Sequence, residues 1–102
     1  MAYVLINKVT AKPGKRQEVV DILLAAGAAF DDDDACLLYL VSTDNEDPDL
    51  IWVQDVWTDQ ASHEAAMATE EMSTQVQRSL PLLAGMPAQT EVQPVGGKGP
   101  GS

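Results

Sequence analysis

One eight-residue segment, Leu50–Trp57, constrains the fold of this chain more than any other part of the sequence. It is rich in residues that favour β structure, and a strand presents alternate residues on opposite faces. One face would carry Trp52, Gln54 and Val56, and the other Ile51, Val53, Asp55 and Trp57. Asp59 follows closely and is a favoured helix N-cap residue. The segment therefore predicts a strand that leads into a helix, with the only histidine, His63, in the first turns of that helix.

The chain before this segment predicts two more strands and a helix. Residues 3–10 are rich in β-forming side chains, and Pro13 with Gly14 predicts a turn after them. From Arg16 onward, apolar residues recur at the spacing of an amphipathic helix: Val19, Ile22, Leu23, Ala26 and Phe30. Residues 35–42 are apolar on both faces, which is typical of a buried, central strand. A short polar turn joins them to Leu50–Trp57, so these two strands should form an antiparallel hairpin.

The chain after this segment predicts two helices and a last strand. The first helix should end near residue 68, and Thr69 should cap the second, whose apolar stripe is Met72, Val76, Leu80 and Leu83. Residues 89–95 predict the fourth strand. The order β-α-β-β-α-α-β is the α+β, ferredoxin-like split βαβ arrangement with an antiparallel four-stranded sheet. We expect residues 1–95 to form this domain and residues 96–102 to be a disordered tail.

Helices on one face of such a sheet leave its other face open. We expect Cys36, Tyr39, Trp52 and Val56 near that open face. A chain of 102 residues can bury only part of its surface alone, and a second copy packed sheet to sheet would cover the apolar side chains. The sequence therefore predicts a homodimer.

The charge of the chain excludes several kinds of partner. Its formal net charge is −10, so the phosphates of nucleic acids and anionic membrane surfaces would be repelled. No segment resembles a signal peptide or a membrane helix, and the single Cys36 allows no intrachain disulfide, which favours a cytoplasmic protein. The four aspartates at residues 31–34 lack the alternating ligands and the glycine of an EF-hand loop, so they predict a solvated loop.

Seven short segments carry a resemblance to a known family. They are Lys12-Pro13-Gly14-Lys15-Arg16, Cys36-Leu37-Leu38-Tyr39, Asp47-Pro48-Asp49, Val56-Trp57, Ser62-His63-Glu64, Pro81-Leu82-Leu83-Ala84-Gly85 and Pro94-Val95-Gly96-Gly97-Lys98. In this order and spacing the chain resembles the antibiotic biosynthesis monooxygenase family of dimeric α/β-barrel proteins, and within it the quinol monooxygenase branch. The resemblance implies a pocket between sheet and helices. It also implies oxygenation of a hydroquinone, an anthrone or a similar electron-rich aromatic by O2 without metal or flavin.

Two polar residues are the expected catalytic groups under this resemblance. His63 is the natural base, because histidine is the side chain that ordinarily titrates near neutral pH. Its other interpretation is a structural histidine bonded to a backbone carbonyl. Asn7 is polar within an apolar strand and could hold a substrate oxygen, or it could face solvent.

Four further residues are expected to bind the substrate. Trp57 could stack on an aromatic ring or belong to the core. Tyr39 could donate its phenol to a bound oxygen or pack in an interface. Asp55 could orient His63 or be exposed. Met67 shares the inward face of its helix with His63.

The chain departs from the haem-degrading members of this superfamily. Those proteins pair a strand-one asparagine with a tryptophan and a histidine on the helices that follow the third strand. Asn7 matches the first position, but the other two fall at about Ala66 and Val76. We therefore expect no haem, and no other cofactor or metal site is predicted.

Three functions stay open on the sequence. The first is a cofactor-independent monooxygenase, and the second is a non-redox isomerase or cyclase on the same scaffold with His63 as base. The third is a non-catalytic, dimeric module that binds small molecules. Oxygen uptake distinguishes the first from the others.

Overall fold

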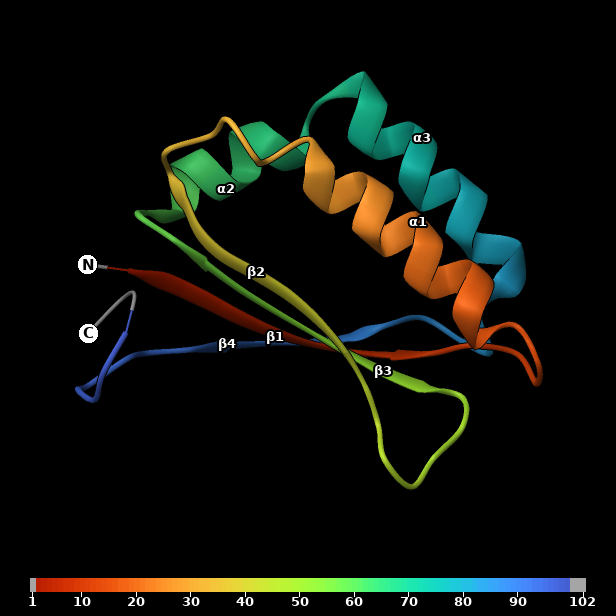
Figure 1. Ribbon diagram of the computed structural model, residues 1–102. Helices are drawn as coiled ribbons and strands as arrows, with labels where there is room; N and C mark the ends of the chain where they lie inside the picture. Colours follow the sequence, from red (N-terminus) through yellow and green to blue (C-terminus); the bar gives the residue numbers. More distant parts are fainter. Residues whose placement is uncertain (1, 100–102) are drawn as a thin grey trace.

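The computed structural model describes residues 2–99, and within them every helix lies on one face of a four-stranded sheet (Figure 1). The elements are β1 (Tyr3–Thr10), α1 (Arg16–Ala28), β2 (Cys36–Thr43), β3 (Leu50–Trp57), α2 (Gln60–Met67), α3 (Glu70–Ser79), the 3-10 helix η1 (Leu80–Leu82) and β4 (Ala88–Val92). The strand order is β2-β3-β1-β4, with every neighbouring pair antiparallel. The predicted α+β ferredoxin-like fold is confirmed, and the sheet of this chain is open rather than closed into a barrel.

The two central strands of the sheet are β1 and β3, whose bounds agree with those predicted from the sequence. β1 and β3 pair along their whole length, from Tyr3 opposite Trp57 to Thr10 opposite Leu50. This register places Leu5, Asn7 and Val9 on the face that carries Val53 and Asp55 from β3, because directly opposed residues share a face. That face is the one covered by the helices, so the central strands direct both apolar and polar side chains toward the helical layer.

The prediction that residues 35–42 form a central strand is wrong, because β2 lies at an edge of the sheet. Its register shifts between Cys36 and Leu38, as at a β-bulge. The bulge lets Cys36 and Tyr39 both face the helices, opposite Trp57 and Asp55, so the expectation that they lie near the open face is also wrong. Both faces of β2 are apolar because one meets the helices and the other belongs to the open face of the sheet.

The last strand is shorter than predicted. β4 ends at Val92, so residues 93–95 lie outside it. Residues 96–99 form neither helix nor strand, and the rest of the expected tail, residues 100–102, lies outside the described residues. The part of β4 that pairs with β1 includes the register Asn7 opposite Gln89, which brings two carboxamide side chains to the same face of the sheet.

The two helices after β3 begin at the predicted caps. The Asp59 carboxylate accepts from the backbone N–H of Ser62 at 2.7 Å, and the Thr69 hydroxyl accepts from the N–H of Met72 at 3.2 Å. These bonds hold the chain direction at the start of α2 and α3, and therefore the placement of His63 and Met72. None of the helices within residues 2–99 is long and apolar enough to cross a bilayer.

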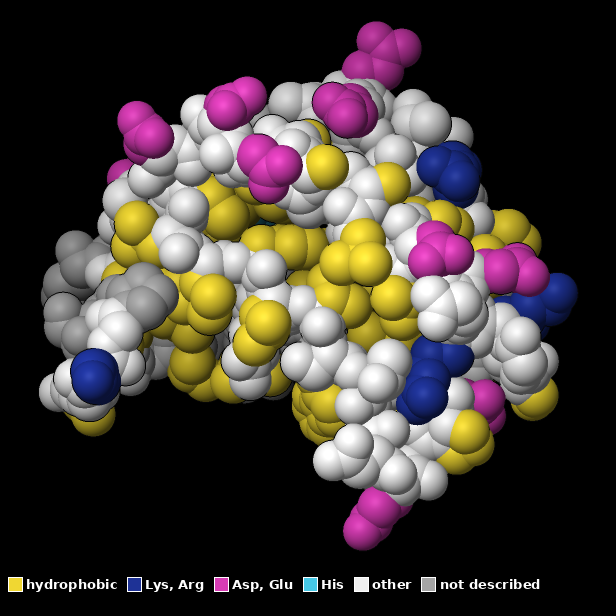
Figure 2. Space-filling view, in the orientation of Figure 1, with side chains coloured by type: hydrophobic (Ala, Val, Ile, Leu, Met, Phe, Trp, Pro, Cys, Tyr) yellow, Lys and Arg dark blue, Asp and Glu magenta, His cyan; other side chains and the backbone are white. Residues whose placement is uncertain are grey.

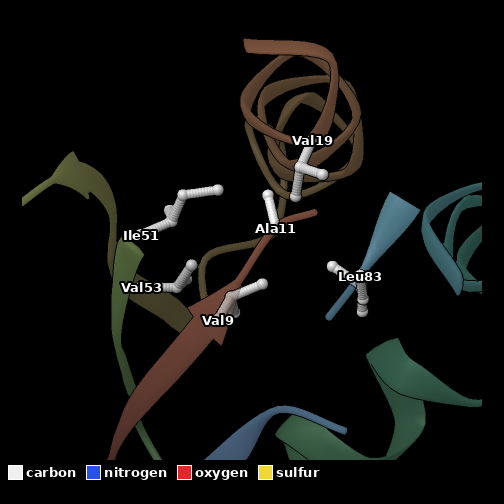
Figure 3. Close-up of a cluster of buried hydrophobic side chains, with 6 residues drawn as sticks. All are labelled: Val9, Ala11, Val19, Ile51, Val53 and Leu83. Carbon is white, nitrogen blue, oxygen red and sulfur yellow. The ribbon is translucent and has the colours of Figure 1, made fainter. Parts of the chain in front are cut away.

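The core is divided into two clusters of buried side chains. One cluster joins β1, β3, α1 and the segment after η1, and its side chains point toward one another in Figure 3: Val9, Ala11, Val19, Ile51, Val53 and Leu83. The other lies nearer the start of β1 and consists of Ala26, Phe30, Trp57 and Met72. A cavity lies where the two clusters meet, and side chains from both line it.

Candidate functional site

The cavity between the helical layer and the sheet has a volume of about 330 Å³. Figure 2 shows hydrophobic side chains in the hollow of the surface between these layers. Most of the lining is apolar, and its polar side chains are Asn7, Tyr39, Asp55, His63, Gln75, Ser79 and Gln89. An apolar enclosure with a few convergent polar groups is the usual form of a small-molecule site.

Asp55 is the centre of the polar network in this cavity. The residue is only 4% exposed. The Trp57 indole donates to Asp55 Oδ2 at 2.8 Å, and Asn7 Nδ2 donates to Asp55 Oδ1 at 3.3 Å. His63 Nε2 lies 3.8 Å from Asp55 Oδ2. One buried carboxylate thus connects a strand asparagine, a core tryptophan and the only histidine of the chain.

The electrostatic state of Asp55 reflects two opposing causes. Burial raises the pKa of the Asp55 carboxyl, because the charged form loses water. The hydrogen bond from Trp57 and the charge that His63 can carry lower the pKa, but the net direction is upward. A positive charge on the neighbouring imidazole therefore favours the charged form of the Asp55 carboxyl.

His63 is held by the start of α2 and by two aromatic rings. It is buried, and its ring centroid lies 5.4 Å from that of Tyr3 and 5.4 Å from that of Trp57. The Asp59 cap fixes the first turn of α2, from which His63 reaches the cavity. The imidazole is therefore confined beside Asp55 while it still lines the cavity.

The structure brings five of the six predicted site residues to the cavity lining. Asn7, Asp55, His63, Met67 and Tyr39 line it. Trp57 does not line it within the described residues. Its side chain is 0% exposed, and its indole N–H donates to Asp55. Stacking of Trp57 on a ligand is therefore no part of the function proposed below.

Tyr39 meets the cavity through its ring rather than through a free hydroxyl. Its phenol donates to the backbone carbonyl of Leu23 at 2.9 Å, and burial raises its pKa far above the ordinary value. The hydroxyl therefore stays protonated and is occupied by the α1 backbone. The ring contributes to the apolar wall together with Phe30, whose centroid is 5.4 Å away.

Two carboxamides in the lining were missed by sequence reasoning. Gln75 lies three residues after Met72 on the inward side of α3, so helical spacing could have indicated it. Gln89 lies on β4 directly opposite Asn7, which only the pairing register reveals. Within residues 2–99, no group of three His, Cys, Asp or Glu side chains could hold a metal ion. Asp31 and Asp32 are exposed, and Asp33 accepts from the N–H of Ala35 in a turn.

Comparisons with known proteins agree with this architecture. The sequence matches the family described as Antibiotic biosynthesis monooxygenase over residues 2–78. No curated protein matches the chain. A solved structure from Chloroflexus aurantiacus J-10-fl, described as a candidate antibiotic biosynthesis monooxygenase, is 34% identical with a TM-score of 0.84. The match covers 97% of this chain and 98% of that one.

Two more distant structures share the fold. One, from Caulobacter crescentus CB15 and described in the same terms, is 16% identical with a TM-score of 0.86, over 93% of this chain and 91% of that one. The other, PA3566 from Pseudomonas aeruginosa, is 24% identical with a TM-score of 0.84, over 93% and 95% of the two chains.

The family match covers most of the chain, and the 34% identical structure covers nearly all of it. Together they support a monooxygenase-like function. The chain belongs to the antibiotic biosynthesis monooxygenase family.

Proposed function

We propose that this chain is a cofactor-independent monooxygenase that oxidises a quinol, an anthrone or a similar electron-rich aromatic with O2. The observation that carries this proposal is the pairing of His63 with Asp55 at the polar part of an otherwise apolar cavity. The volume of about 330 Å³ falls at the lower end of ordinary small-molecule sites. The proposal places the protein in the quinol branch of its family and in the cytoplasm.

In this proposal His63 is the general base. Its imidazole takes a phenolic or enolic proton from the bound aromatic and becomes positively charged. The Asp55 carboxylate, 3.8 Å away, stabilises that charge and keeps the ring oriented. Trp57 and Asn7 hold the carboxylate in place through their hydrogen bonds. An apolar enclosure strengthens each of these interactions, since little water screens them.

The oxygenation step follows from the anion that His63 creates. The electron-rich anion passes one electron to O2, and the resulting organic radical and superoxide combine to form a carbon–oxygen bond. Proton return gives a hydroperoxide, whose O–O bond breaks as water leaves. One oxygen atom stays on the carbon as a new carbonyl and the other leaves in water, so the substrate itself supplies both electrons and both protons.

An oxygen electrode tests this function with the purified protein in the presence of a chelator. A panel of hydroquinones and anthrones should show O2 uptake above the spontaneous rate. His63→Ala should lower that uptake by about a hundredfold or more, the usual contribution of a general base. Gln60→Ala is the matched control, because Gln60 lies exposed on the same helix and, within residues 2–99, its side chain bonds only to Glu64.

Two outcomes would contradict the assignment. Equal uptake by wild type and a folded His63→Ala variant would show that His63 is not the base. No uptake with any aromatic of the panel would overturn the monooxygenase, and a non-redox isomerase or a binding module would then be the better interpretation.

We further propose that the protein is a homodimer that packs through the open face of the sheet. Apolar side chains on this face are Val4, Ile6, Leu38, Leu40, Trp52, Val56 and Val92. Leu40 is 46% exposed and Val92 37% exposed in the single chain. Figure 1 shows that the helices leave this side of the sheet uncovered. Light scattering at micromolar concentration should therefore give the mass of two chains.

A further inference from the structure

We propose that the cavity selects uncharged aromatic substrates over otherwise identical carboxylates, with Gln89 as a specificity-determining residue. The inference rests on the proposed function in that it takes the same cavity as the substrate site. It narrows the substrate class to neutral molecules whose oxygen substituents are hydroxyl, carbonyl or amide groups. Three observations carry it: the charge of the lining, the placement of the basic residues, and the free carboxamide of Gln89.

The lining of the cavity contains no lysine or arginine among the described residues. Its ionisable side chains are Tyr39, Asp55 and His63. The positive charge available on His63 is already matched by the Asp55 carboxylate at 3.8 Å. A ligand carboxylate would therefore enter an apolar space beside an existing anion, without a second cation to compensate its lost hydration.

Further carboxylates surround the same polar part of the cavity. Tyr3 packs against His63 with a centroid distance of 5.4 Å. Burial raises the pKa of the Tyr3 phenol, and the neighbouring Glu91, Glu64 and Asp55 carboxylates raise it further. Figure 2 shows acidic side chains spread over the helical layer on the face that carries the hollow. The local field is therefore negative, as expected from a net charge of −10.

Five of the six basic side chains lie away from the cavity. Lys8 lies over the Trp52 ring, on the open face of the sheet. Lys15 pairs with Glu18, and Arg16 donates to the carbonyls of Asp44 and Asp47. Lys12 and Lys98 are exposed in the turn after β1 and near the C-terminus.

Arg78 is the basic residue whose side chain contacts the cavity lining. It donates to Gln75 Oε1 at 2.9 Å. It does not line the cavity, and it borders a separate surface depression together with Glu18 and Asp21. Its charge is exposed to solvent and lies beside acids, so it offers little compensation to an anion inside the cavity.

Gln89 supplies the kind of contact that a neutral oxygen needs. It lies on the edge strand β4 opposite Asn7, on the face of the cavity. Asn7 Nδ2 is engaged by Asp55 and by the Val53 carbonyl, whereas the Gln89 carboxamide bonds to no other residue within 2–99. It can donate to a carbonyl or accept from a hydroxyl, and it carries no charge.

Isothermal titration calorimetry with two redox-inert ligands tests the proposal at pH 7.5. The ligands are 6-hydroxy-2-naphthamide and 6-hydroxy-2-naphthoate, which share ring and phenol and differ in the charge of one group. The wild type should bind the amide at least about tenfold more tightly than the carboxylate, as one uncompensated charge repulsion predicts. Gln89→Lys should reduce this preference by about tenfold through tighter carboxylate binding.

The control variant is Gln77→Lys, an identical change at an exposed α3 position outside the lining. It should leave the preference for the amide unchanged.

Equal or tighter binding of the carboxylate by the wild type would overturn the proposal, as would failure to bind either ligand. An equal response of Gln89→Lys and Gln77→Lys would overturn the role of Gln89. Because both ligands bind without turnover, the result is separate from oxygen uptake. If the protein prefers the amide but consumes no O2 with any quinol, the proposed monooxygenase function is rejected and the proposed substrate selectivity is still supported.

Discussion

Among single residues, Asp55 combines a proposed functional role with a stability cost. Burial raises its folded-state pKa above the ordinary value of 3.8. A group with a raised folded-state pKa contributes stability that is fully present below the unfolded-state pKa. That contribution is lost as the pH rises through the folded-state pKa. At neutral pH the chain therefore keeps an ionisable group in a place where its charged form is unfavourable.

Asp55→Asn separates these two properties. Asparagine keeps an acceptor for the Trp57 indole but removes the charge beside His63. We expect a melting temperature at pH 7 equal to or above that of the wild type, and a smaller difference or a reversal at pH 4. Oxygen uptake should fall by about a hundredfold or more, because the base loses its orienting carboxylate. Melting curves from pH 4 to 8 check the first expectation, and a clearly lower melting temperature at pH 7 would contradict it.

The residues of the site were predictable to different degrees. Strand alternation places Asn7 and Asp55 on the inner face, and a single histidine on an amphipathic helix is easily noticed. Alternation places Trp57 on that face as well, but it cannot tell that Phe30 and His63 cover the indole. Gln89 depends on which residue of β1 it opposes, and that register is set by tertiary pairing.

At the scale of secondary-structure elements, α1 lies close against the Tyr39 ring of β2 at Gly27. A Cβ atom at this position would lie 2.5 Å from Cε2 of Tyr39. The Tyr39 hydroxyl bonds to Leu23 on the same helix, so the ring cannot move away without loss of that bond. Glycine is a poor helix former, but at position 27 its lack of a side chain allows the Tyr39 ring of β2 to pack against α1.

Gly27→Ala should accordingly destabilise the fold. Overpacking of this kind costs about 1–3 kcal/mol, which outweighs the roughly 1 kcal/mol that alanine gains over glycine inside a helix. Gly85→Ala is the control, because a Cβ there meets no atom within 4 Å. Urea unfolding of both variants measures the difference. A Gly27→Ala variant as stable as the wild type would show that the Tyr39 ring can move aside at no cost in stability.

The elements themselves follow from local patterns, except at the edges of the sheet. Asp59 and Thr69 identify the helix starts because capping is a contact within a few residues. β2 was misplaced because apolar residues on both faces do not distinguish a central strand from an edge strand that faces the helices on one side and the open face of the sheet on the other. The bulge at Leu37 has no local sequence signal, although it decides where Tyr39 points.

At the scale of the whole molecule, the proposed dimer predicts the effect of a charge on the open face. Leu40→Asp should give the mass of one chain in light scattering, because the buried carboxylate would oppose the sheet-to-sheet contact. Leu24→Asp is the control, since Leu24 is 54% exposed on α1 and lies away from that face. A Leu40→Asp variant that keeps the wild-type dimer mass would place the interface elsewhere.

The division of the core into two clusters has a thermodynamic consequence for the search for the substrate. A molecule that fills the cavity touches both clusters and completes the interior, so its binding and the folding of the chain are linked by mass action. A ligand at a hundred times its dissociation constant adds about 2.7 kcal/mol to the free energy of unfolding. In a domain of this size each kcal/mol raises the melting temperature by roughly 4–8 °C. A screen of cell metabolites for an increase in melting temperature can therefore find the natural substrate before any reaction is known.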